Sequence, residues 1–277
     1  MKVNPHLEII LATIIWGSSG IFIKYLNLDP TIITFFRLAV PTAILWVFFK
    51  LKNRKIFRSI DKMMIFASSL NAVRMFFYFV GYTFTSIGNA VIILYSWPVF
   101  ATIFSVLYLK EKISKRTAGL LGVAFLGIIL IYSTSEISFA SNDFIGMSAM
   151  LLSAAVYAST VVIFKKESHK YTQFETVFYQ NVIGAFIFLP FLFVNVFPTI
   201  GQLSILTIYA ILIGLVGFSL FYSALKKIKA STASFLTYNE VLSALVFGVI
   251  ILGETFTWNM IVGGTLIIGA SVLLKKN

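Results

Sequence analysis

The sequence contains no cysteine, only two histidines and few charged residues, which make up 12% of its 277 positions. The absence of cysteine excludes disulfides, thiolate catalysis and cysteine-based metal sites. His6 and His169 are far apart and no carboxylate cluster accompanies them, so we expect no metal site. A soluble domain has about a quarter charged residues. This chain therefore has too little charge for an ordinary soluble enzyme.

Motifs for energy-consuming or transferase chemistry are also missing. There is no P-loop motif and no polar domain that could hold one, so we expect no ATP hydrolysis and no bound cofactor. An embedded prenyl- or phosphotransferase would need several carboxylates together for Mg²⁺, whereas Glu240 stands alone within an apolar segment. Any driving force must then come from a solute or ion gradient.

What the sequence does have is apolar length: 59% of its residues are hydrophobic and 29 are phenylalanine. A membrane-spanning helix needs about 20 mostly apolar residues, and the apolar windows between charge clusters number ten. We predict an all-α integral membrane protein with ten transmembrane helices. The expected spans are 7–26, 31–50, 63–83, 88–109, 117–133, 145–164, 174–195, 202–224, 231–252 and 257–274.

The basic residues lie on one side of this predicted topology. Of the 22 Lys and Arg residues, 19 fall in the terminal segments and loops that share a side with residue 1, and the opposite loops have none. Because basic loops resist translocation, both termini are expected in the cytoplasm. The formal charge of +12 is explained by this bias, so the expected surroundings are a lipid bilayer and not nucleic acid.

The two halves of the chain show a weak internal repeat. Residues 90–111 align with residues 233–254 at an offset of 143, which pairs Tyr95 with Tyr238 and Glu111 with Glu254. We therefore divide the chain into repeats of five spans, residues 1–138 and 139–277. Five crossings make the second copy enter from the opposite side, and inverted repeats are typical of secondary transporters.

Several short segments resemble one family of such transporters. These are Ile-Ile-Trp-Gly-Ser-Ser at 14–19, Pro98 in the fourth span, and the Leu-Lys-Glu and Leu-Gly-Glu endings at 109–111 and 252–254. Together with the five-plus-five plan, they resemble the drug/metabolite transporter superfamily, EamA type, over the whole chain. The resemblance implies alternating-access transport of small metabolites.

A narrower resemblance concerns bacterial amino-acid exporters of that family. The segments Tyr-Phe-Val-Gly-Tyr and Leu-Tyr-Ser-Trp-Pro resemble stretches that supply their cavity aromatics. Phe79 stands where those exporters carry histidine. The resemblance implies a substrate-binding role for Tyr78, Tyr82, Tyr95, Trp97 and Tyr157, the last at a position where tryptophan is frequent in those exporters.

Ionisable residues inside the spans are the main site candidates, because charges at that depth usually face a cavity or each other. Arg74 and Glu240 both fall near the bilayer centre of their predicted helices. Arg74 would bind a substrate carboxylate bidentately and Glu240 an ammonium group. Three alternatives remain: a permanent ion pair between the two, no contact at all, or proton coupling by Glu240.

The third span carries Asn71, Arg74, Tyr78 and Tyr82 at helical spacing, which predicts one polar and aromatic stripe. Facing the ninth span, and with Tyr95 and Trp97 beside it, this stripe would form a half-aromatic, half-charged pocket. Such a pocket suits a zwitterion with an apolar side chain.

Other candidates have two readings each. Arg37 either extends to the interface or acts in gating, and Trp16 either lines the cavity or packs in the core. Pro98, next to Trp97, is the best hinge candidate because proline removes a helical hydrogen bond.

We therefore expect a carrier that exports apolar or aromatic amino acids, or similar small amphipathic metabolites, across a prokaryotic cytoplasmic membrane. The first span begins near residue 7, which leaves no room for a transit peptide. The alternatives are a carrier for cationic or quaternary ammonium compounds on the same fold, and a non-transporting scaffold or embedded enzyme. A monomer is expected, with a homodimer as the alternative.

Overall fold

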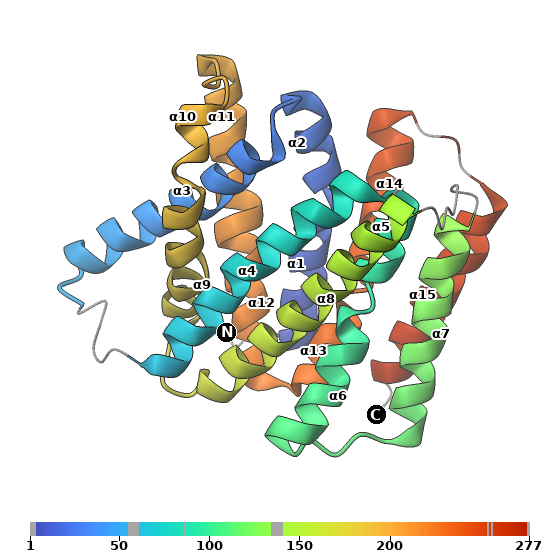
Figure 1. Cartoon of the computed structure of the whole chain (residues 1–277). Coiled ribbons are helices and arrows are strands. Elements are labelled where there is room, and N and C mark those ends of the chain that lie inside the picture. The colour runs from blue at the N-terminus through green and yellow to red at the C-terminus, as the bar shows by residue number, and fades with distance from the viewer. Residues whose placement is uncertain are drawn as a thin grey trace.

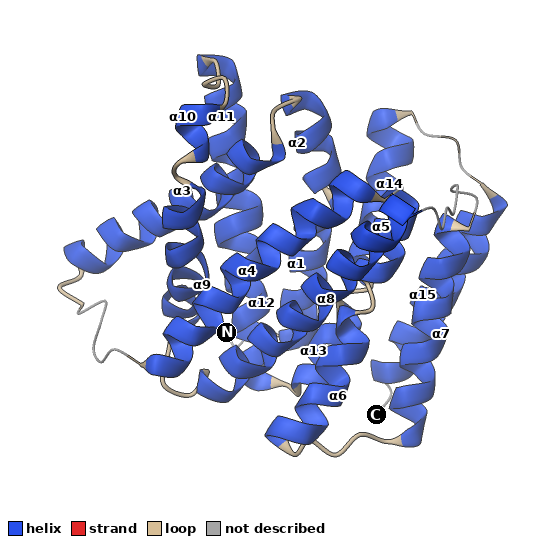
Figure 2. Ribbon diagram, in the orientation of Figure 1, coloured by secondary structure: helices blue, strands red, loops and turns tan. Residues whose placement is uncertain are grey.

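The computed structural model describes residues 4–54, 61–85, 87–133, 141–253, 255 and 257–275 (Figure 1). Every regular element in these ranges is a helix (Figure 2). Nine helical segments of this described part are long and apolar enough to cross a membrane, and the shorter apolar helix Trp258–Leu274 brings the total to ten. The prediction of an all-α fold with ten spans is confirmed.

Each half contributes five spans, some built from more than one helix. The first half contains α1 (Pro5–Gly17) with α2 (Ser19–Leu26), α3 (Pro30–Leu51), α4 (Lys62–Phe84), α5 (Ile87–Leu94) with α6 (Trp97–Leu109), and α7 (Lys115–Tyr132). The second half contains α8 (Ser141–Glu167), α9 (Gln173–Phe188) with α10 (Phe191–Val194), α11 (Ile200–Tyr209) with the π-helix η1 (Ala210–Gly217) and α12 (Phe218–Lys227), α13 (Ala230–Leu236) with α14 (Asn239–Leu252), and α15 (Trp258–Lys275).

Short polar residues set the helix starts. Asp29 accepts a hydrogen bond from the Thr31 amide at 2.8 Å, and Pro30 occupies the first helical position of α3, where no amide is needed. Thr172 and Glu175 form a reciprocal capping box at the start of α9. These local signals place the helix ends independently of tertiary packing.

Matching interruptions break one span in each half. The fourth span breaks at Tyr95–Ser96, between α5 and α6, and the ninth at Thr237–Tyr238, between α13 and α14. We had expected Pro98 to act as a hinge within a continuous helix. Instead, the helix is already interrupted just before Pro98. It stands in the first turn of α6, where its missing amide leaves no hydrogen bond unmade.

The helices of the two halves pack against each other across the centre of the molecule. Helix α4 packs on α8 and α9, α3 on α9, α1 on α12 and α14, and α7 on α15. Large apolar side chains such as Phe186 and Ile250 stay exposed on the outside. Such an exterior is suited to lipid and not to water.

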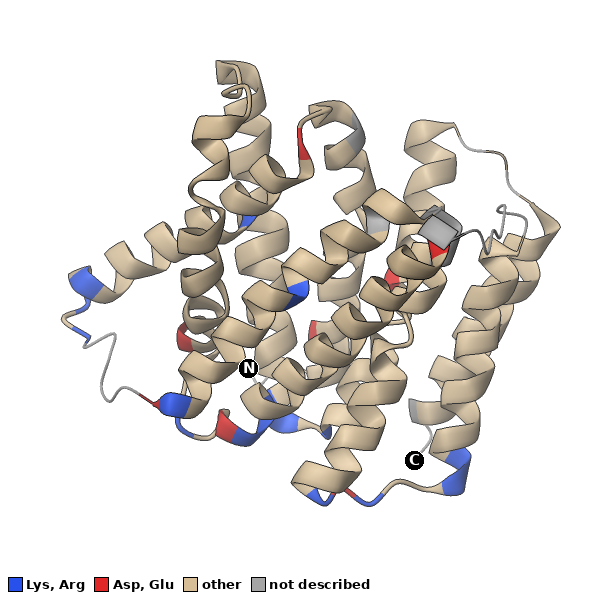
Figure 3. Cartoon of the chain, viewed as in Figure 1, with Lys and Arg blue, Asp and Glu red and all other residues tan. Residues whose placement is uncertain are grey.

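Most Lys and Arg residues lie near one end of the helices, which we call the basic end (Figure 3). Lys227 pairs with Glu8 of α1 at 2.7 Å, and Arg116 donates to the Leu273 carbonyl of α15 at 3.3 Å. Both described chain ends therefore lie at the basic end. We call the other side the opposite end.

Further links close the basic end between the halves. The Glu111 carboxylate, just after α6, accepts from the Ala230 amide at 2.7 Å and from the Ser231 hydroxyl at 2.8 Å. Lys229 Nζ donates back to the Lys112 carbonyl at 2.8 Å. These bonds tie the end of α6 to the start of α13.

Candidate substrate cavity

A cavity of about 520 Å³ lies between the two halves. Its lining includes Trp97 and Glu240 beside the interrupted spans, and also Pro30 and Thr83, where α3 begins and α4 nears its end. The cavity therefore extends from the middle of the bundle toward the opposite end. Its volume is in the range of small-molecule sites.

Arg74 is the most deeply buried charge on the cavity wall, with 8% of its surface exposed. Its guanidinium lies 4.3 Å from the ring centroid of Tyr157 and 5.9 Å from that of Tyr78. Ser153 of α8 donates to the Arg74 carbonyl at 3.2 Å. Aromatic faces and a backbone contact thus hold this cation at the cavity.

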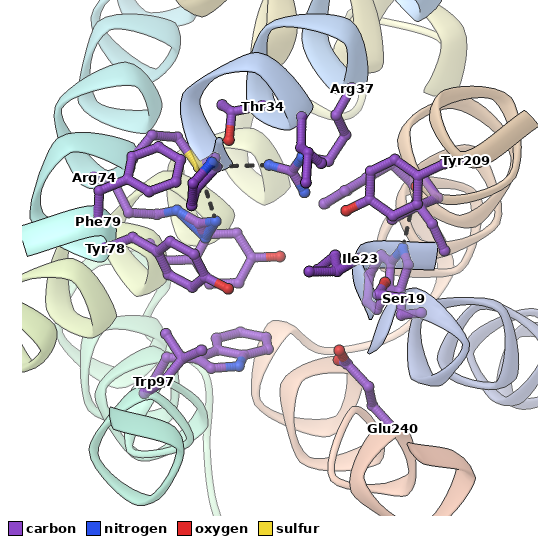
Figure 4. A pocket seen from close by; sticks show the side chains of 18 of the residues that line it. Ser19, Ile23, Thr34, Arg37, Arg74, Tyr78, Phe79, Trp97, Tyr209 and Glu240 are labelled. Carbon is purple, nitrogen blue, oxygen red and sulfur yellow. Dashed lines mark hydrogen bonds between the residues drawn. The ribbon is translucent and has the colours of Figure 1, made fainter. Parts of the chain in front are cut away.

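Arg37 lines the same cavity from α3. Arg37 Nη2 lies 3.5 Å from the sulfur of Met75, and Arg74 Nη2 lies 3.4 Å from the same atom. Figure 4 shows Arg37 and Arg74 on the same side of the cavity. Arg37 therefore points inward, and the alternative in which it extends to the lipid interface is wrong.

Glu240 faces the cavity from another wall, in the first turn of α14 (Figure 4). Its carboxylate is hydrogen-bonded to the phenol of Tyr95. Among the described residues no ion pair joins Arg74 to Glu240, so the reading of a permanent pair between them is wrong. The two charges line one cavity without touching.

Aromatic residues predicted from the sequence also line the cavity, namely Trp16, Tyr78, Tyr95, Trp97 and Tyr157. Trp97 and Tyr157 pack edge to face with ring centroids 4.7 Å apart. Trp16 lines the cavity and also packs in the core, since its indole donates to the Ile213 carbonyl at 3.3 Å and its ring lies 4.8 Å from Phe218. Trp16 therefore lines the cavity and packs in the core at the same time.

Two predicted site residues do not line the cavity. Asn71 is fully buried and donates to the Gln180 carbonyl at 3.1 Å, so it joins α4 to α9 and does not line the cavity. Pro98 is also absent from the lining. The side chain of Tyr82 lies outside the described part of the structure.

The structure adds cavity residues that the sequence did not indicate. These are chiefly Met75, Tyr209 and Phe218. Tyr209 hydrogen-bonds to Ser19, and Phe218 lies 5.8 Å below the Arg37 guanidinium. Of these three, only Tyr209 could have been suspected from the sequence, because it places a phenol within an apolar span. Met75 and Phe218 look like ordinary core residues.

Sequence comparison identifies the class of protein. The EamA-like transporter family matches twice, over residues 5–133 and 144–275, once in each half. The chain belongs to the EamA-like transporter family and is a transporter, not an enzyme. The two matches fit the arrangement as two five-helix repeats, and the boundary at residues 138/139 stays a prediction.

Individual relatives support this assignment. An uncharacterized transporter of Archaeoglobus fulgidus is 27% identical over 96% of this chain and 97% of its own. The pseudopaline exporter CntI of Pseudomonas aeruginosa is 24% identical over 88% of this chain and 85% of its own. Human solute carrier family 35 member G1 is 30% identical over 75% of this chain and 60% of its own. A crystal structure with 14% identity superposes with a TM-score of 0.86, covering 98% of this chain and 96% of its own, and shows the same fold.

Proposed function

We propose that this protein is a secondary-active carrier that exports amino acids or similar small amphipathic metabolites by alternating access. The observation that carries the proposal is the central cavity, which places guanidinium groups and a carboxylate on separate walls with aromatic rings between them. A zwitterion with an apolar part complements such a wall. The export direction is supported by the relative named as a pseudopaline exporter.

Alternating access is supported by a difference between the basic end and the opposite end of the helix bundle. The basic end is tied by Glu111 and Lys229 across the halves, while the cavity reaches Pro30 and Thr83 at the opposite end. Related halves with matched interruptions can exchange these roles and so expose the site to the other side. In this scheme Arg37 and the Pro98 segment are gating elements.

The distribution of charge supports a proposed location and orientation. We place the basic end in the cytoplasm, because basic segments resist translocation, and hence both termini there. With archaeal and bacterial relatives among the matches, the cytoplasmic membrane of a prokaryote is the proposed site. A monomer is the proposed unit, since the cavity is lined within one chain.

A flux measurement tests the proposal. Purified protein in liposomes should move amino acids down an imposed gradient, and Arg74→Gln should abolish the flux of solutes that carry a carboxylate while leaving the protein folded. Unchanged flux in this variant would remove Arg74 from the site. No flux of any amino acid, amine or related metabolite would remove the transport proposal itself.

Glu240 has a separate test. If it binds the ammonium group, Glu240→Gln should weaken solute binding by at least about tenfold, the effect of losing about 1.4 kcal/mol. If it instead carries a proton in each cycle, the variant should keep solute binding and lose its dependence on a pH gradient. Flux measured with and without that gradient separates the two roles.

A further inference from the structure

The charges on the cavity wall do not balance. Arg37 and Arg74 both line the cavity, and Glu240 is the single carboxylate among its described lining residues. We infer that the transported solute carries two acidic groups and one amino group, as an aminodicarboxylate does. This inference rests on the proposed function and names the substrate class of that same site.

The two arginines lie close enough together to form a joint site for the acidic groups of the solute. Each places an Nη2 atom within 3.5 Å of Met75 Sδ, so these two atoms can be no farther apart than the sum of two such contacts. The thioether is a neutral, weak acceptor. It orients both guanidinium groups and neutralises neither.

Among the described residues, no carboxylate forms a direct ion pair with either arginine. In the part of the chain that the structure describes, neither arginine has a carboxylate within 4.0 Å. Arg74 Nε is buried without a hydrogen-bond partner. Buried charges are normally paired and hydrogen-bonded because desolvation is costly, so the missing partners are expected on the solute.

Aromatic rings hold the cations in place without supplying charge. Arg74 stacks over Tyr157 at 4.3 Å, and Arg37 lies 5.8 Å from Phe218. Such contacts stabilise a guanidinium while its outward N–H groups stay free for a ligand. Each guanidinium can bind one carboxylate through two parallel hydrogen bonds.

Glu240 completes the pattern from the other wall. Its hydrogen bond with Tyr95 leaves acceptor positions for one ammonium group. Two carboxylates and one ammonium give the solute a charge of −1, which offsets the +1 of this lining. A simple zwitterion would leave one guanidinium unpaired in the loaded cavity.

The test uses six-carbon compounds that differ only in charged groups. L-2-aminoadipate has two acids and one amine, L-norleucine lacks the second acid, adipate lacks the amine, and L-lysine replaces the second acid by an amine. For the purified full-length protein we expect L-2-aminoadipate to bind at least about tenfold tighter than each of the other three, measured by calorimetry and by thermal shift.

Two variants locate the effect. Arg37→Gln should weaken L-2-aminoadipate binding by at least about tenfold and L-norleucine binding by a much smaller factor, because only L-2-aminoadipate has a second acid to lose its partner. Arg116→Gln removes an exposed cation from the basic end, at the start of α7, and should change neither. If Arg37→Gln does not fold, the wild-type series still decides.

The outcomes distinguish failure of the aminodicarboxylate inference from failure of the proposed carrier function. If L-norleucine binds and is transported as well as L-2-aminoadipate, the inference fails and the amino-acid carrier stands. If chloride alone gives the same thermal shift as L-2-aminoadipate, an inorganic anion fills the arginine pair and the inference also fails. If no compound of the series, nor any other amino acid or amine, binds or moves, the proposed function fails.

Discussion

Tyr95 and Tyr238 occupy equivalent positions in the two repeats, and their ring centroids lie 6.4 Å apart at the centre of the protein. Each stands at the interruption of its span, Tyr95 between α5 and α6 and Tyr238 just before α14. Their surroundings differ. The Tyr95 phenol is bonded to Glu240, whereas the Tyr238 hydroxyl is buried without a hydrogen-bond partner in the described structure.

This difference predicts opposite outcomes for the same substitution at two related positions. Tyr95→Phe should weaken binding of amino-bearing solutes and lower the free energy of unfolding by about 1.5–3 kcal/mol, because a carboxylate loses a hydrogen bond. Tyr238→Phe, its matched control, should be neutral or slightly stabilising, since no bond is lost. Calorimetric binding and melting temperatures check both. Equal effects at the two positions would contradict the asymmetry.

Much of the fold could be predicted from sequence because a bilayer imposes simple rules. Apolar length set the ten spans. The offset of 143 paired Tyr95 with Tyr238, and each of these tyrosines stands at an interruption of its span. The form of the interruptions could not be predicted. Hydropathy measures composition, so it cannot show that Ser18 separates α1 from α2 or that residues 210–217 form a π-helix.

The candidate site was predictable where residues are costly to bury. Arg74 and Glu240 stand out as charges in apolar spans, and both line the cavity. Asn71 shares a helix face with Arg74 by spacing alone, yet it bonds to Gln180 of α9 instead. Helical spacing gives a direction around one helix and does not say which neighbour lies there. The place of Met75 in the site could not be predicted from the sequence, because it depends on the contact of its sulfur with Arg37 of another helix.

The bond between Glu111 and the start of α13 should control opening of the basic end. Glu111→Ala removes acceptors of the Ala230 amide and the Ser231 hydroxyl. Because the chain has no cysteine, Ser234→Cys introduces a single thiol at a buried position near this contact. We expect that thiol to react with a maleimide at least several-fold faster in the Glu111→Ala background, as opening becomes more frequent.

A matched thiol controls for reagent access. Ser204 of α11 is exposed, so the thiol of Ser204→Cys should react equally in both backgrounds. An unchanged rate at position 234 would show that the Glu111 contact does not hold the basic end closed.

Asp61 gives a pH-dependent prediction outside the spans. Partial burial raises the pKa of Asp61. The hydrogen bond from the Met63 amide and the Lys170 ammonium together lower it by more than burial raises it, so the net pKa is below its ordinary value of 3.8. A lowered carboxyl pKa contributes stability above the unfolded value, which is lost as pH falls through the folded pKa. Asp61→Ala should lose about 1 kcal/mol at pH 7 through the missing helix cap.

The pH profile distinguishes the charge from the cap. The difference in melting temperature between wild type and Asp61→Ala should shrink from pH 7 toward pH 3. Asp61→Asn keeps a capping oxygen for the Met63 amide, so its own stability should depend less on pH in this window. A constant difference between wild type and Asp61→Ala down to pH 3 would contradict the assigned role of the charge.

The final prediction concerns the close approach of α7 and α15. A Cβ added at Gly127 would lie 2.6 Å from the Gly263 carbonyl, and one added at Gly263 would overlap the Gly127 carbonyl. Backbone cannot yield as a flexible side chain can, so either glycine-to-alanine change should cost about 1–3 kcal/mol.

The same two helices carry their own controls. A Cβ at Gly122 of α7 or at Gly269 of α15 would meet nothing within 4 Å. Alanine there should stabilise by about 0.5–1 kcal/mol, since glycine is the poorer helix former. Melting temperatures of the four variants in one detergent therefore test whether α7 and α15 pack through Gly127 and Gly263, because equal shifts at all four positions would mean that helix propensity alone sets the response.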